Sequence, residues 1–250
     1  MRPRNALLVA IAVLLSVDAR PQHGHPGPQP GGEGTPGGPS GDISVSSRAI
    51  ARYDFEDAAD IGKDSIAGHD LTPNNSPTTT TGVEGLAVNL VNASSQDLRR
   101  LNDTAFDLDG SITTCAYVKP TSFTANIDPS RRWVSTTGWI LRIAQTTGVP
   151  AFYVYDGDSN TGATSAALDA GEWYHICGVA SPGFQQIYVN GSPGTPPGSP
   201  DSLVSAVTAN FLVGTNGSDQ HADAAIDRVL IFDYALSAVE ILALYQEVSG

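Results

Sequence analysis

Positive charge is scarce in this sequence. Its 250 residues include 13 Lys and Arg against 26 Asp and Glu, and the formal net charge at pH 7 is −13. Nucleic acids and anionic membrane surfaces are bound through basic patches, so this composition argues against both as partners. The acidity is typical of a protein that stays soluble in an extracellular or salty medium.

Long apolar runs are also lacking. An uninterrupted apolar segment covers residues 6–15, which is too short to span a bilayer comfortably. Arg2 and Arg4 precede it and small residues follow at 17–19, which is typical of a signal peptide over residues 1–19. An uncleaved N-terminal anchor is the alternative. The segment predicts a secreted or cell-surface protein with no membrane insertion of the mature chain.

Residues 20–47 have almost no large apolar side chains. Pro and Gly dominate this segment, so it cannot bury enough surface to offset its ordering entropy. The glycines do not recur at every third position, which excludes collagen. We expect a disordered linker over residues 20–47 and one folded domain over residues 48–247.

From residue 48 onward, short β-branched and aromatic segments alternate with turn residues. The central pattern is a hairpin of residues 171–179 and 184–189, turned by Pro182-Gly183 and ended by Asn190-Gly191. Further strands are expected at residues 49–55, 82–90, 111–118, 139–144, 151–155, 210–213 and 225–232, whereas 78–81 is interpreted as loop. Ser237 and Glu240 fit a capping box that begins a short helix. With no βαβ rhythm, the pattern predicts an all-β, two-sheet antiparallel sandwich with a short C-terminal helix.

Cysteine is limited to Cys115 and Cys177, each within a strong strand. In an oxidising compartment the natural inference is a disulfide between them. Two buried free thiols are the alternative. A catalytic Cys–His pair has less support, because His175 lies two residues before Cys177 and neither has an obvious orienting partner.

Seven segments follow one another in an order known from one group of proteins. They are Arg52-Tyr53-Asp54-Phe55-Glu56, Gly82-Val83-Glu84-Gly85-Leu86-Ala87-Val88, Ser111-Ile112-Thr113 running to Val118-Lys119-Pro120, Glu172-Trp173-Tyr174-His175, Ile187-Tyr188-Val189-Asn190-Gly191, Ala225-Ile226-Asp227-Arg228-Val229 and Ala235-Leu236-Ser237-Ala238-Val239-Glu240-Ile241. Together they resemble the laminin G-like, concanavalin A-like lectin/glucanase jelly rolls of secreted, often bacterial, multidomain proteins. The resemblance implies a jelly roll over nearly all of residues 48–247. Pentraxins look similar around both cysteines, and their two cysteines pair.

The resemblance leaves function open, because this fold hosts lectins, glycosidases, adhesion modules and spacers. A glucanase would require alternating carboxylates on a strand, since retaining glycosidases use two carboxyl groups about 5 Å apart. Asp54 and Glu56 share a face of the expected opening strand but have no third partner. We therefore expect no enzyme but a secreted recognition module that binds carbohydrate or glycoprotein through sandwich loops. A structural or adhesive protein–protein domain without a glycan site, or a glycosidase with displaced carboxylates, are the alternatives.

Calcium is the candidate cofactor, because many relatives bind it through Asp, Asn and loop carbonyls. By resemblance to pentraxins, half of a site would fall near Asn216 and Asp219, and Asp223 extends the same polar cluster. The other half would fall near residues 145–148, which contain no carboxylate. A solvated loop is the alternative for this cluster.

Ligand-binding candidates combine an acidic turn with an aromatic side chain. Asp156, Asp158 and Asn160 look like the first turn of a calcium loop, with an acidic hairpin turn as the alternative. Trp133 follows two arginines in a loop-like stretch and is the best candidate to stack on a sugar ring. Trp139 and Trp173 begin strands and are expected in the core.

Overall fold

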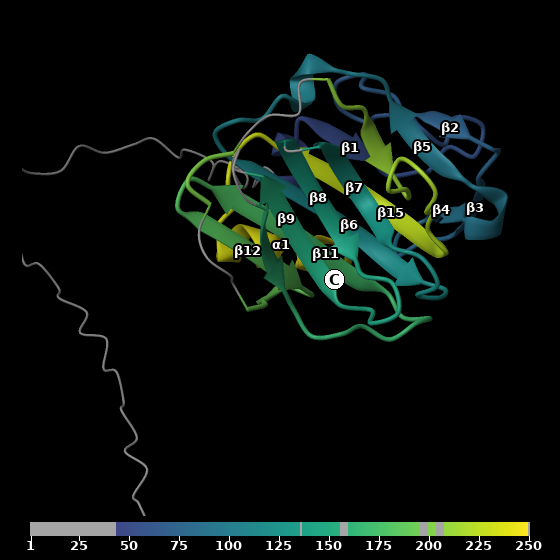
Figure 1. Cartoon of the computed structure of the whole chain (residues 1–250). Helices are drawn as coiled ribbons and strands as arrows, with labels where there is room; N and C mark the ends of the chain where they lie inside the picture. The colour runs from purple at the N-terminus through teal and green to yellow at the C-terminus, as the bar shows by residue number, and fades with distance from the viewer. Residues whose placement is uncertain (1–43, 136, 156–159, 196–199, 204–207, 250) are drawn as a thin grey trace, which may run out of the picture. The chain divides into compact units, whose positions relative to one another are not determined.

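Two antiparallel β-sheets stack face to face in the computed structural model, which describes residues 44–135, 137–155, 160–195, 200–203 and 208–249 (Figure 1). This is the predicted all-β, two-sheet sandwich. The predicted signal peptide and most of the predicted linker lie outside the described residues. Among the described residues, no helix is long and apolar enough to cross a membrane.

Eight of the described strands form one sheet, ordered β13-β12-β11-β6-β15-β4-β3, with β1 paired to β15. Its strands are β1 (Ala51–Tyr53), β3 (Thr78–Thr81), β4 (Leu86–Leu90), β6 (Ile112–Pro120), β11 (Tyr174–Ser181), β12 (Phe184–Val189), β13 (Ser192–Pro193) and β15 (Ala224–Phe232). The predicted central hairpin is β11–β12, and Gly183 supplies the positive φ of its turn. Strand β11 is buried on both faces, as its composition predicts.

Seven described strands form the second sheet, ordered β10-β9-β8-β7-β14-β5-β2. They are β2 (Thr72–Asn74), β5 (Asp97–Arg100), β7 (Ile127–Val134), β8 (Thr137–Ile143), β9 (Pro150–Tyr155), β10 (Asn160–Thr164) and β14 (Phe211–Val213). Side chains alternate between the faces of each strand, and the inward ones of both sheets form the main core. Val118 and Ile176 of the first sheet and Leu141 and Phe152 of the second belong to this core.

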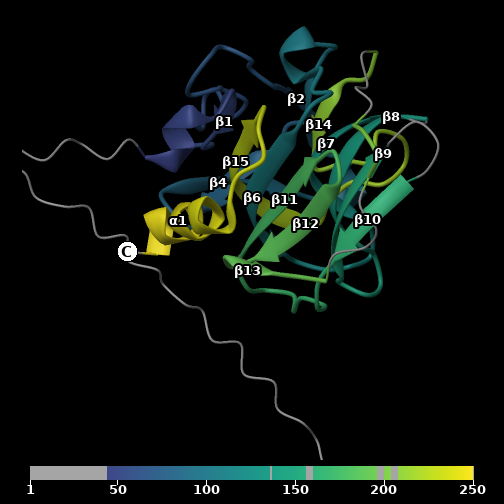
Figure 2. The ribbon, with the colours of Figure 1, turned by 90° about the vertical axis from the view of Figure 1, so that its left-hand side faces the viewer.

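The C-terminal helix α1 (Ala238–Ser249) lies on the outer side of the eight-stranded sheet, whereas β8, β9 and β10 lie beyond its inner side (Figure 2). The predicted capping box is present: Ser237 N donates to Glu240 at 2.8 Å, and Glu240 N donates to Ser237 Oγ at 3.3 Å. Ile241 and Leu244 join a second apolar cluster on that face of the sheet. The helix therefore covers one sheet and leaves the outer face of the other free of it.

The predicted disulfide joins Cys115 to Cys177 within this second cluster. The two residues lie directly opposite one another in β6 and β11, and neither is exposed. Paired sulfurs are not available as thiols, so the alternatives of buried free thiols and of a catalytic cysteine are wrong.

Three short 3-10 helices complete the described chain. They are η1 (Val45–Arg48), η2 (Asn92–Ser94) and η3 (Thr104–Phe106). Helix η1 begins inside the predicted linker, and Ser46 N donates to Glu247 of α1 at 3.3 Å. The last residues of that segment are therefore attached to the folded domain.

Four expectations about local structure were wrong. The run interpreted as loop at 78–81 is β3, because its threonines pair along β4. Trp133 lies in strand β7 and not in a loop. Trp173 is only half-buried and precedes β11. Asp54 and Glu56 do not share a strand face, because β1 ends at Tyr53 and Phe55 adopts φ 58°.

Candidate functional site

The outer face of the seven-stranded sheet carries the candidate site. Arg132 in β7 lies opposite the core residue Trp139 in β8, and its side chain is fully buried. Successive side chains of a strand point to opposite faces, so its neighbours Arg131 and Trp133 point outward. The expected core position of Trp139 is thus confirmed, and its register places Trp133 on the open face.

Hydrogen bonds of the buried Arg132 side chain fix this register of β7. The Arg132 guanidinium donates to the Asp103 carbonyl at 2.8 Å, to Asn102 Oδ1 at 2.9 Å and to the Asp107 carboxylate. Moving the strand by one residue would break these bonds and turn Trp133 into the core. A buried arginine with several acceptors therefore holds the exposed tryptophan in place.

A row of directly opposed side chains crosses the whole outer face. Residues opposite one another on neighbouring strands share a face, so the row can be followed from strand to strand. Taken through β2, β5, β14, β7, β8, β9 and β10, it consists of Thr72, Arg99, Leu212, Arg131, Ile140, Tyr153 and Gly162. The row places arginine, aliphatic and aromatic groups side by side.

Aromatic side chains cluster on one half of this face. The rings of Trp133 and Tyr155 meet edge to face, with 5.5 Å between centroids and an interplanar angle of 82°. Tyr153 lies opposite Gly162, where an added Cβ would come within 2.6 Å of the tyrosine ring. Gly162 therefore leaves the space that the Tyr153 ring occupies. All three aromatic residues are half-buried, so each keeps part of its surface in solvent.

A buried carboxylate lies between two arginines beside these rings. Asp128 accepts two bonds from Arg142, at 2.7 and 2.8 Å, and one longer bond from Arg131 at 3.3 Å. Burial by itself lowers the pKa of Arg142, but the bonds to Asp128 leave it above its usual value. For Arg131 burial prevails over Asp128, and its pKa is lowered. Asp128 thus binds Arg142 through two short hydrogen bonds and Arg131 through one longer bond.

A groove of about 470 Å³ runs beside Trp133. Strand residues Arg131, Trp133 and Leu212 line one part of it, and the loop after β14 lines the other. That loop contributes Asn216 and Ser218. The segment of Trp133 and the segment of Asn216, which were predicted separately, therefore meet in one groove. Its lining combines an aromatic ring with amide, hydroxyl and guanidinium groups, which are the groups that bind sugar rings and their hydroxyls.

Asn216 organises the loop that borders the groove. Its Oδ1 accepts backbone N–H groups of Ser218, Asp219 and Gln220 at 2.9 to 3.2 Å. Its Nδ2 and Ser218 Oγ both donate to Asp219 Oδ1, and these two bonds lower the pKa of Asp219. The loop is therefore held by its own side chains.

The predicted calcium ligands are brought together only in part. Asn216 and Asp219 are in contact, whereas Asp223 accepts bonds from Asn92 N, Ser122 Oγ and Thr124 Oγ1. Among the described residues, the group of three or more acid, imidazole or thiol side chains close enough to share an ion is Cys115, His175 and Cys177, which holds the disulfide. Calcium at Asn216, Asp219 and Asp223 stays a prediction.

The structure describes one residue of the second predicted ligand segment. Asp156 and Asp158 fall outside the described residues, while the backbone of Asn160 opens β10 and pairs with Tyr155. Sequence reasoning missed Tyr153, Tyr155 and the arginine pair with Asp128. Two tyrosines spaced by two residues in a predicted strand were a usable signal, because that spacing puts both on one face.

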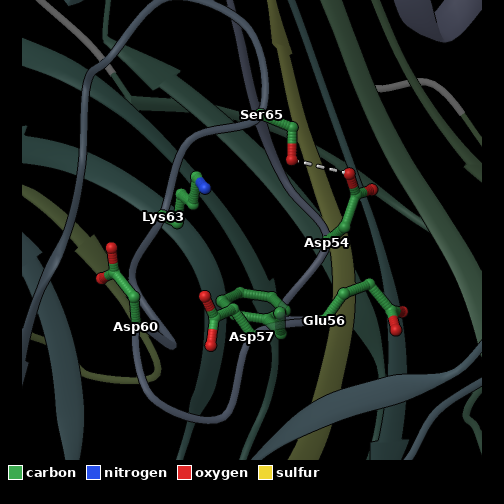
Figure 3. A pocket seen from close by; sticks show the side chains of 7 residues that line it. Asp54, Glu56, Asp57, Asp60, Lys63 and Ser65 are labelled. Atoms are coloured by element: carbon green, nitrogen blue, oxygen red, sulfur yellow. Dashed lines mark hydrogen bonds between the residues drawn. The ribbon is translucent and has the colours of Figure 1, made fainter.

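An acidic pocket of about 560 Å³ lies elsewhere, on the loop after β1. Figure 3 shows Glu56 and Asp60 at opposite sides of it, and Asp54 turned toward Ser65. Asp54 also binds Arg52 at 2.7 Å, and Glu56 accepts the Leu86 N–H at 3.2 Å. The carboxylates of Asp54 and Glu56 are therefore engaged in structural contacts.

Comparison with known proteins agrees with this architecture. The Laminin_G_3 family model, described as the concanavalin A-like lectin/glucanases superfamily, matches residues 93–242. Domain 4 of AbnA, an extracellular arabinanase from Geobacillus stearothermophilus solved with arabinotriose, has a TM-score of 0.64 at 17% identity over 80% of this chain and 100% of that one. No curated protein sequence matches the chain.

Botulinum neurotoxin binding domains are also similar in structure. The serotype G domain has a TM-score of 0.63 at 16% identity, over 81% of this chain and 51% of that one. A structure of botulinum neurotoxin type C has a TM-score of 0.61 at 12% identity, over 82% of this chain and 52% of that one. Cell entry of that toxin depends on interaction with two ganglioside molecules. The chain spans about half the length of these toxin domains. On the family match, it belongs to the concanavalin A-like lectin/glucanases superfamily.

Proposed function

We propose that this protein is a secreted, non-catalytic carbohydrate-binding module. The ligand lies on the outer face of the seven-stranded sheet, against Trp133, Tyr155 and Tyr153, and extends into the groove bordered by Asn216. The observation that carries the proposal is the half-exposed Trp133–Tyr155 pair beside that groove. The ligand therefore contacts the sheet face together with one loop, rather than loops alone.

The chemistry of the face supports a sugar ligand. Aromatic rings offer flat apolar surfaces for the C–H faces of a pyranose or furanose, and amide and guanidinium groups bind hydroxyls in fixed directions. The arabinanase domain solved with arabinotriose and the ganglioside-dependent toxin add support by analogy of fold. The buried disulfide suits an extracellular protein.

The test is glycan-array screening of the purified protein, followed by calorimetry on the best ligand. Trp133→Ala should weaken binding roughly 30-fold, as expected for a central aromatic contact. Trp173→Ala is the matched control, because Trp173 lines a groove with Tyr117 and Tyr245 elsewhere on the molecule. Equal affinity of the Trp133 variant and the wild type would contradict the proposed face.

Calcium is tested in the same experiment by repeating the titration with a chelator. A loss of affinity that calcium restores, and that Asp219→Asn reproduces, would establish calcium-assisted binding at the Asn216 loop. Unchanged affinity would remove calcium from the proposal and leave the aromatic face in it.

A protein-binding module without a glycan site is the second candidate. Helix α1 exposes Val239 and Leu242, with 77% and 41% of their surfaces in solvent. Neighbouring exposed apolar side chains are a feature of protein–protein contact surfaces. A blank glycan array, together with partner binding lost on Val239→Asp but not on Trp133→Ala, would favour this function.

A further inference from the structure

We propose that Arg131 binds an oxyanion of the ligand, so that the module takes an acidic saccharide carrying a carboxylate or a sulfate. This inference rests on the carbohydrate-binding function proposed above and names its ligand class. It is carried by the charge balance around Asp128, by the surroundings of the Arg131 side chain, and by the lining of the groove.

The charges around Asp128 do not cancel. Two guanidinium groups share one carboxylate, and the short bidentate bonds go to Arg142. Within the described part of the chain, Arg131 has one side-chain hydrogen bond, of 3.3 Å to Asp128, and 13% of its side chain is exposed. A charge this far removed from water is costly unless a counter-charge meets it. Asp128, Arg131 and Arg142 together carry one net positive charge, which an anionic ligand would compensate.

The Arg131 side chain also has an unused donor. Its Nε is buried and has no hydrogen-bond partner among the described residues. Arginine presents its donors as a planar fork that matches a carboxylate or sulfate. Arg131 lines the groove beside Trp133, so a ligand stacked on that ring lies next to the guanidinium.

The lining of the groove favours an anion over a cation. Among the described residues that line it, Arg131 is the charged one, and Ser135, Asn210, Asn216 and Ser218 have neutral polar side chains. Asp97, the other buried acid of this face, is already bound by two bonds from Arg99. The overall charge of −13 acts on a ligand at long range, but salt screens it beyond about 8 Å at physiological ionic strength.

The test compares matched acidic and neutral ligands on the wild-type protein. Oligosaccharides containing uronic acid are titrated beside their carboxyl-reduced forms, and sulfated oligosaccharides beside their desulfated forms. The acidic member of one pair should bind about 10- to 100-fold more tightly than its neutral counterpart, because a charge-assisted hydrogen bond is lost in the latter. The pair that responds identifies carboxylate or sulfate. Added salt should weaken the acidic ligand selectively.

Variants test whether Arg131 is responsible for the preference for the acidic ligand. Arg131→Gln should reduce the affinity for the acidic ligand to that for the neutral one, and Arg131→Lys should retain part of the difference. Lys119→Gln removes an equal charge from the eight-stranded sheet and should change nothing. If Arg131→Gln does not fold, the titrations of acidic and neutral ligands on the wild-type protein still test whether the module prefers an acidic saccharide.

The outcomes separate this inference from the proposed function. Neutral members that bind as tightly as acidic ones would overturn the oxyanion at Arg131 and leave a carbohydrate-binding module. An acid preference that survives in a folded Arg131→Gln protein would likewise overturn the role of Arg131. Failure of every saccharide, acidic or neutral, to bind would defeat the proposed function and this inference together.

Discussion

One buried carboxylate, that of Asp64, is surrounded by backbone amides. Asp64 accepts four backbone N–H groups, from Arg52, Ile66, Ala67 and His69, at 2.9 to 3.1 Å. A buried carboxylate that accepts several amides replaces the water it has lost. Asp64 therefore shapes the loop after β1.

Ionisation of Asp227 should change the free energy of unfolding. It is fully buried in β15, where its Oδ2 accepts the Val83 N–H at 2.9 Å and its Oδ1 has no partner among the described residues. Burial raises the pKa of Asp227 to about 7, although the amide bonds oppose the rise. The folded protein thus keeps a proton that the unfolded chain releases near pH 4.

The sign of the effect follows from this difference in proton binding. Because the folded state binds more protons between about pH 4 and pH 7, the free energy of unfolding falls as the pH rises through that range. The loss is at most about 4 kcal/mol. Asp227→Asn stays neutral at every pH, so relative to wild type it should gain stability from pH 4 to pH 8. Urea unfolding of both proteins across this range measures the gain, and parallel pH profiles would contradict the raised pKa.

The candidate site shows what can be predicted from individual residues. Trp133 was singled out because it follows two arginines in a stretch that was interpreted as a loop, and Asn216 because of the resemblance to pentraxins. Asp128, Arg131 and Arg142 were not found, since their function depends on contacts between strands that no local pattern displays. A charged residue alone does not indicate whether its charge is compensated.

Secondary-structure elements were predictable where the residues of the element itself determine its conformation. The hairpin β11–β12 and the capped helix α1 carry strong local signals in their turns and cap. Strands β3 and β7 carry no such local signal. The four threonines of β3 and the Asp-Pro-Ser-Arg-Arg run of β7 form strands because a neighbouring strand pairs with them. Tertiary context outweighs propensity at these positions.

The cap of α1 offers a test at the scale of an element. Ser237→Ala removes the hydroxyl that accepts the Glu240 N–H, and should lower the free energy of unfolding by about 1 kcal/mol. Val239→Ala is the matched control, since that side chain is 77% exposed in the same turn. Chemical denaturation of the two variants measures both effects. Equal and negligible losses would mean that packing of Ile241 and Leu244, rather than the cap, determines the stability of the helix.

At the scale of the whole molecule, the two faces of the sandwich differ in what covers them. The eight-stranded sheet is sealed by α1 over the disulfide, whereas the seven-stranded sheet presents arginines and aromatic rings outward. The ordered succession of segments was enough to predict this fold, because a jelly roll is defined by the order of its strands. Which face stays open depends on where the last helix packs.

The disulfide should contribute to the stability of the whole domain. Cys115 and Cys177 are 62 residues apart, so cross-linking them restricts the unfolded chain by about 4 kcal/mol on the chain-entropy model. Cys115→Ala with Cys177→Ala should lower the melting temperature by roughly 8 to 16 °C for a domain of this size. Alanine is preferred to serine because the site is fully buried and a hydroxyl there would need a new partner.

Reductant supplies the control for the same experiment. Wild-type protein unfolded and refolded with reductant should melt where the double variant does, and the variant should not respond to reductant at all. Since the bond lies beneath α1 on the face remote from Trp133, the variant should still bind the ligand below its melting temperature. An unchanged melting temperature, with two titratable thiols in the wild type, would contradict the pairing. A variant that melts lower and also loses the ligand would instead mean that the helix-covered sheet maintains the binding face.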